Sequence, residues 1–95
     1  MFPGLTTKLS EKTVASAATI VADADVLFVT GSTQIDDIVP KTGGFSQLLG
    51  IVPVSGSLTL SSSGNIAVGD ALSQNRLTWL IYSKERDSWY IADAL

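Results

Sequence analysis

The sequence of 95 residues contains no cysteine and no histidine. Without cysteine the chain has no disulfide, no thiolate metal ligand and no cysteine nucleophile. Without histidine it cannot form a serine–histidine triad or a zinc site with imidazole ligands. These absences remove the commonest catalytic and metal-binding arrangements, and we expect neither enzymatic activity nor a cofactor.

Charge and long apolar runs are also scarce. Charged residues make up 16% of the chain, and the six basic residues are scattered from Lys8 to Arg86 at a net charge of −3. Because nucleic-acid binding depends on clustered lysine and arginine, no nucleic-acid partner is expected. The longest apolar run, 48–54, is far shorter than the roughly 20 residues of a membrane span, so no membrane partner is expected either.

What the chain does have is enough apolar residues, 45%, to form a folded core. Its length fits one domain. A domain this small buries only a little over ~60% of the surface that its unfolded chain exposes, and no disulfide reinforces it. The small size and the few charges therefore favour self-association, with part of the surface covered by a partner.

From residue 18 onward the pattern is that of an all-β fold. Short runs rich in valine, isoleucine, threonine and aromatics are separated by glycine, proline, aspartate and serine. The expected strands are 19–21, 26–30, 46–54, 57–60, 65–68, 76–83 and 87–92. Because Ile35 and Ile38 lie three residues apart, 34–39 is expected to be a kinked strand or a turn of a β-solenoid instead of a flat strand. Pro53 predicts an edge position or a bulge for its strand. The last two strands, joined by Lys84-Glu85-Arg86, predict a β-hairpin. Residues 18–95 are predicted to form one compact β-sandwich or barrel-like domain.

Residues 1–17 are predicted to form an extended N-terminal arm with at most one helical turn. The arm has few large apolar side chains, which are Phe2, Leu5 and Leu9.

Two acidic pairs are candidates for chemistry. Asp23 and Asp25 could ligate calcium, but the glycine and glutamate of a calcium-binding EF-hand loop do not follow, and turn formation is the preferred interpretation. Asp36 and Asp37 are adjacent, so on a strand they would point to opposite faces and would not converge on one substrate. We therefore expect no metal site and no catalytic carboxylate pair.

Four aromatic residues of the predicted hairpin, Trp79, Tyr82, Trp89 and Tyr90, are the remaining candidates. They could stack on sugar rings, or they could pack in the core or between subunits. Strand alternation sends only one aromatic of each strand to each face, and tryptophan and tyrosine are enriched at interfaces. Core or inter-subunit packing is therefore the preferred interpretation.

The order of several short motifs resembles a small β module of tailed-bacteriophage virion proteins. The resemblance covers roughly residues 18–92 and rests on Asp-Val-Leu-Phe-Val-Thr-Gly (25–31), Ile-Asp-Asp-Ile (35–38) before Pro40, Gly-Gly-Phe (43–45), Ser-Gly-Asn-Ile-Ala (63–67), Leu-Ile-Tyr (80–82) and Ser-Trp-Tyr (88–90). Such modules occur in capsid decoration (cement) proteins, head fibres and tail fibres.

The resemblance implies a non-enzymatic virion protein, made in the host cytoplasm and located on the outer capsid surface. It implies a homotrimer that binds the major capsid protein and stabilises capsomer contacts. On this interpretation the N-terminal arm contacts the capsid, and its candidate anchors are Phe2, Leu5 and Leu9. The alternative is a head-fibre or tail-fibre domain that binds a host receptor or glycan. The absence of a coiled coil or repeat array favours the decoration protein.

Overall fold

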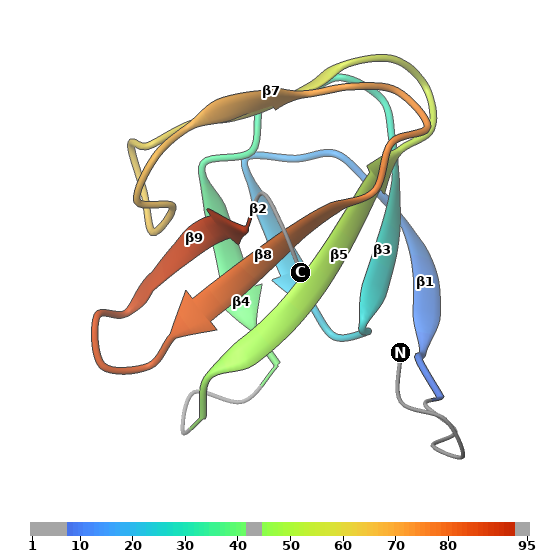
Figure 1. The fold of residues 1–95 in the computed structure, drawn as a ribbon. Helices are drawn as coiled ribbons and strands as arrows, with labels where there is room; N and C mark the ends of the chain where they lie inside the picture. Colours follow the sequence, from blue (N-terminus) through green and yellow to red (C-terminus); the bar gives the residue numbers. More distant parts are fainter. Residues whose placement is uncertain (1–7, 42–44, 93–95) are drawn as a thin grey trace.

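The computed structural model describes residues 8–41 and 45–92, which fold into β-strands and short connections without a helix (Figure 1). The strands are β1 (Glu11–Ala15), β2 (Thr19–Ala22), β3 (Val26–Thr30), β4 (Asp37–Pro40), β5 (Gln47–Pro53), β6 (Leu58–Leu60), β7 (Asp70–Leu72), β8 (Thr78–Ser83) and β9 (Ser88–Ala92). The predicted all-β fold class is confirmed.

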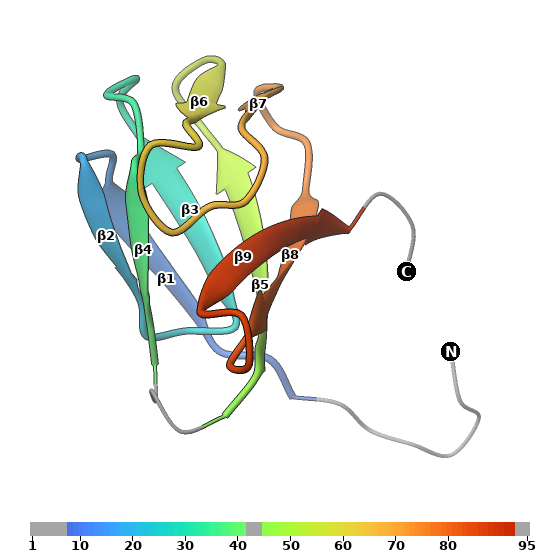
Figure 2. The ribbon, with the colours of Figure 1, turned by 90° about the vertical axis from the view of Figure 1, so that its left-hand side faces the viewer.

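The strands form one mixed sheet and two small ones. The five-stranded sheet has the order β1-β3-β5-β8-β9, parallel from β1 to β5 and antiparallel from β5 to β9. β2 and β4 form a parallel pair, and β6 and β7 an antiparallel pair. From β1 to β5 the chain alternates between the large sheet and the β2–β4 pair, which lie as two layers in Figure 2.

The core lies between these layers. Alternate residues of β2, β3, β5 and β8 point inward, as a period of two requires. The largest fully buried side chain is Trp89, and it belongs to one hydrophobic cluster with Leu27, Ile38, Leu49 and Leu80. Among the described residues no polar or charged side chain is buried.

Residues 11–15 were expected to belong to the extended arm, and they form β1 at the edge of the five-stranded sheet. The register pairs Glu11 with Val26 and Ala15 with Thr30. The start of the strand is fixed by Asp25, whose carboxylate accepts hydrogen bonds from the Ser10 amide (2.8 Å) and hydroxyl (3.1 Å). The sequence of β1 does not indicate a strand, because its partner lies fifteen residues further along the chain and most of its side chains are exposed.

Pro53 does not place its strand at an edge, because β5 is the middle strand of the large sheet. The amide of Gly50 donates to the Asp25 carbonyl just before β3, and the amide of Val54 donates to the Val29 carbonyl on β3, so the nitrogen of Pro53 faces the β8 side. The pairing of β8 with β5 begins at Ile51, opposite Thr78, so β8 has no residue paired with Pro53. The missing N–H therefore costs no ladder hydrogen bond, which is why proline is compatible with this central strand.

The predicted strand at 65–68 is also wrong. There the backbone makes only an isolated bridge between Ile66 and Trp89, and the strand that pairs with β6 is β7, at Asp70–Leu72. The predicted C-terminal hairpin is confirmed, with Tyr82 opposite Trp89.

Candidate functional site

The acidic pair Asp23 and Asp25 attaches β1 to the domain. The Asp23 carboxylate pairs with the Lys12 ammonium at 2.7 Å, and this hydrogen bond lowers the pKa of Asp23. Asp25 binds Ser10 instead. The two carboxylates therefore bind different residues, Asp23 binding Lys12 and Asp25 binding Ser10. No group of three or more potential metal ligands occurs among residues 8–41 and 45–92.

Asp36 and Asp37 belong to a polar cluster that fastens the loop after β6 to β4. Asp36 accepts hydrogen bonds from the Gln34 amide (2.9 Å) and the Ser61 hydroxyl (2.8 Å), and these bonds lower its pKa. Asp37 accepts one from the Asn65 backbone amide at 3.0 Å. Both carboxylates are engaged in holding the fold together.

Asn65 completes this cluster, and the sequence analysis did not identify it. Its Nδ2 donates to the Ile38 carbonyl (2.7 Å), and its Oδ1 accepts from the Ile38 amide (2.9 Å). The side chain thereby replaces a neighbouring strand along the edge of β4 that faces away from β2. Gly64 precedes it, and a Cβ there would lie 2.2 Å from Asp37 Oδ1 and 2.3 Å from the Asp36 carbonyl. The Gly-Asn step was the only sequence signal of this close approach.

The four aromatic candidates divide between core and surface. Tyr82 and Trp89 are buried, with ring centroids 5.2 Å apart and planes tilted by 48°. The Trp89 Nε1–H donates to the Ile38 carbonyl at 2.8 Å. The Tyr82 hydroxyl donates to the Asp87 carboxylate, which raises the pKa of the phenol. Trp79 and Tyr90 lie on the opposite side of the same strands.

That opposite side is apolar from β3 to β9. Leu48, Ile81 and Tyr90 are neighbours in register on β5, β8 and β9, and are 44%, 41% and 43% exposed. We call this surface the outer sheet face. It consists of the large apolar side chains that point away from the core on these strands, together with the adjoining Leu77: Val26, Phe28, Leu48, Val52, Leu77, Trp79, Ile81 and Tyr90. Within this set Leu48, Leu77, Ile81 and Tyr90 are exposed, Phe28, Val52 and Trp79 are half-buried, and Val26 is buried.

Trp79 lies at the centre of the outer sheet face. A Cβ at Gly50, its cross-strand neighbour, would be 3.1 Å from the tryptophan ring and 2.9 Å from Leu77 Cδ1. The indole and the leucine therefore cover the bare glycine backbone. This packing half-buries Trp79 and makes the surface continuous between β5 and β8.

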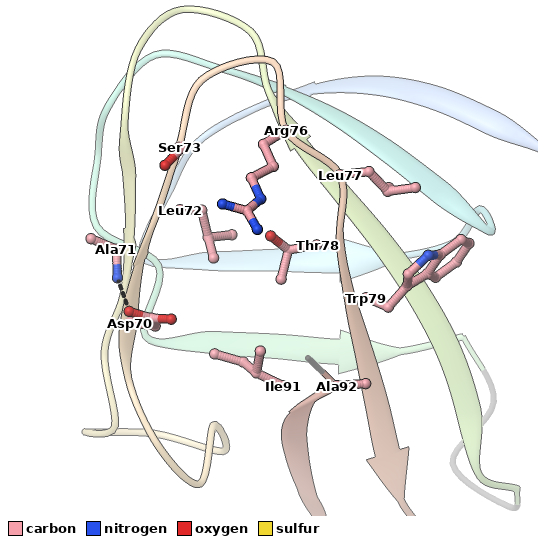
Figure 3. A pocket seen from close by; sticks show the side chains of 10 residues that line it. All are labelled: Asp70, Ala71, Leu72, Ser73, Arg76, Leu77, Thr78, Trp79, Ile91 and Ala92. Atoms are coloured by element: carbon pink, nitrogen blue, oxygen red, sulfur yellow. Dashed lines mark hydrogen bonds between the residues drawn. The ribbon is translucent and has the colours of Figure 1, made fainter. Parts of the chain in front are cut away.

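A hollow of about 210 Å³ lies between β7 and the β8–β9 pair (Figure 3). Asp70 and Arg76 border it without forming an ion pair, since Lys12–Asp23 is the salt bridge found in the described part of the chain. The Trp79 ring points away from the other lining side chains (Figure 3). A second hollow of about 390 Å³, lined in part by Val68, Asp70 and Tyr90, adjoins it.

The predicted arm anchors are only partly within the described residues. Leu9 precedes β1 and is 50% exposed, whereas Phe2 and Leu5 lie outside the described range. On the far layer Val21 and Val39 pair across β2 and β4, and they are 49% and 43% exposed. Within residues 8–41 and 45–92 there is no helix long and apolar enough to cross a membrane.

Comparison with known proteins finds no family model, no curated protein and no solved structure that matches this chain.

Proposed function

We propose that this chain is a non-enzymatic structural protein that acts through its surfaces, as a bacteriophage capsid decoration protein. In this proposal a homotrimer binds the major capsid protein on the outer capsid surface and stabilises the contacts between capsomers. The observation that supports an interaction protein most is the outer sheet face, where three large apolar side chains in one register row are each more than 40% exposed. The assignment to a virion rests on the sequence resemblance.

The stabilisation follows from mass action. A protein that binds the assembled capsid but not the free capsomers lowers the free energy of the assembled state by its own binding. Three copies held together bind multivalently, so weak contacts of each copy combine into tight attachment. This mechanism needs a rigid domain and matching symmetry, and it needs no reactive group.

The proposed capsid contact is the segment before β1. Ser10 and Lys12 fix the start of β1 through Asp25 and Asp23, so β1 begins at a fixed point of the domain. The half-exposed Leu9 belongs to the segment before β1, and Phe2 and Leu5 are the further anchors proposed from the sequence.

The test uses capsids of the encoding phage prepared without this protein. We expect the full chain to sediment with the capsids, and a chain lacking residues 1–9 to stay in solution while keeping its fold and oligomeric state. The deletion must spare Ser10, because Ser10 binds Asp25. The matched control replaces Thr6 and Thr7 by alanine and should bind normally. Full-length protein that fails to bind would refute the capsid function, and equal binding by the deletion would refute the role of the arm.

A fibre domain that binds a receptor glycan is the second candidate, supported by the hollow beside Tyr90. The exposed tyrosine ring and the Asp70 carboxylate line it together, and sugar recognition combines an aromatic surface with hydrogen-bonding groups. Binding to host polysaccharide that is lost in Tyr90→Ala, without binding to capsids, would favour this candidate over the decoration protein.

A further inference from the structure

We propose that copies of this chain associate with one another through the outer sheet face. The inference names the surface of self-association, and it rests on the proposed function only for the statement that the protein is a homo-oligomer. It does not depend on capsid binding.

The chemistry of the face is the first argument. On β3, β5, β8 and β9 the side chains that point away from the core are apolar, hydroxyl-bearing or glycine, and none is charged. Charge is confined to the periphery, at Glu11 on β1 and at the hairpin tip from Lys84 to Asp87. An uncharged apolar centre with a charged rim is the composition of a protein interface.

The second argument is that such a face is complementary to itself. When the uncharged centre meets the centre of another copy, no like charges are brought together there, and apolar rows meet apolar rows. A charged partner would instead lose hydration without gaining an ion pair on this face. The sheet arrangement suits such pairing, because sheets pack face to face about 10 Å apart with interdigitated side chains.

The third argument is size. With strands about 4.8 Å apart and about 3.3 Å per residue, the four strands β3, β5, β8 and β9, of five to seven residues each, cover roughly 360 Å² in projection. A standard interface buries about 800 Å² of accessible surface on each partner. The face can therefore supply the apolar centre, and the rim on β1 and the hairpin can supply the remainder. Two copies with opposed outer sheet faces, or three copies arranged around an axis, would both cover this face.

The absence of native cysteine allows a direct test by cross-linking. Ile81→Cys places one thiol in the middle of the row formed by Leu48, Ile81 and Tyr90, and Val39→Cys places one on the other layer at similar exposure, 43% against 41%. With a short bis-maleimide, we expect Ile81→Cys to give a covalent pair of two 10.0-kDa chains on a denaturing gel. Val39→Cys should remain a single chain. Equal yields from both variants, or none from Ile81→Cys, would overturn the inference.

A charge substitution gives the complementary test. Ile81→Lys should weaken self-association at least about 100-fold, because each contact would bury an unpaired ammonium group, whereas Val39→Lys should leave the solution mass unchanged. Circular dichroism checks that both variants are folded. An Ile81→Lys protein that keeps the wild-type mass would overturn the inference, as would a monomeric wild type, which would leave the face to another segment or another protein. An oligomer that depends on Ile81 and does not bind capsids would refute the proposed function alone.

Discussion

Replacing Asn65 by alanine removes both side-chain hydrogen bonds that connect the loop after β6 to the edge of β4. The Ile38 amide loses its acceptor, at 2.9 Å in the wild type, and the Ile38 carbonyl loses the Nδ2 donor at 2.7 Å. That carbonyl keeps the Trp89 Nε1–H at 2.8 Å. The substitution therefore leaves one backbone donor of the fully buried Ile38 without a partner.

The expected loss follows from these two bonds. An unsatisfied buried donor costs about 1–3 kcal/mol, and loss of the second bond adds about 1 kcal/mol, so the free energy of unfolding should fall by about 2–4 kcal/mol. For a domain of this size such a change lowers the Tm by about 8–32 °C. It is a large part of a typical total stability of about 5–15 kcal/mol.

The assay is chemical and thermal unfolding followed by circular dichroism. Ser62→Ala, an exposed position in the same loop, is the matched control and should stay within about 0.5 kcal/mol of the wild type. Asn65→Asp keeps an acceptor for the Ile38 amide, but it turns a carboxylate oxygen toward the Ile38 carbonyl and adds a negative charge beside Asp37, so it too should be less stable than the wild type. If Asn65→Ala were as stable as the Ser62→Ala control, the proposed replacement of a strand by this side chain would be wrong.

Two further predictions concern the same cluster. Gly64→Ala should destabilise the domain by at least about 2 kcal/mol in denaturant unfolding, because its Cβ would meet Asp37 Oδ1 at 2.2 Å and the Asp36 carbonyl at 2.3 Å; unchanged stability would contradict this close approach. The pKa of Asp36 is lowered by hydrogen bonds from Gln34 and Ser61, so its contribution to stability is complete above the ordinary pKa of 3.8 and is lost as the pH falls below it. Unfolding curves measured down to acid pH should therefore show a smaller acid loss for Asp36→Asn than for the wild type, and equal losses would exclude this role.

The sequence predicted best what is local. The C-terminal hairpin was recognisable because β8 and β9 are adjacent, aromatic-rich and joined by a short charged link. The exact bounds of β3 were predictable from the apolar run that ends at Gly31. β1 was not recognised as a strand, since its parallel partner is distant and its exposed residues carry no apolar alternation.

The surface depends on pairings that one sequence does not reveal. Alternation indicated that the hairpin aromatics would divide between two faces, but not that Trp89 would be buried and Tyr90 exposed. The register row from Leu48 to Tyr90 needs β5 beside β8, a neighbourhood that no short motif encodes. The role of Asn65 likewise depends on a contact with Ile38, twenty-seven residues away.

The most direct test of the central claim, that this protein acts as a self-associating structural module, is the mass of the unmodified chain by equilibrium sedimentation over a wide range of concentrations. We expect a homo-oligomer, and the resemblance to virion modules predicts three copies of the 10.0-kDa chain. A mass of two copies would keep self-association and exclude the trimer. A mass of 10.0 kDa at every concentration would contradict the account.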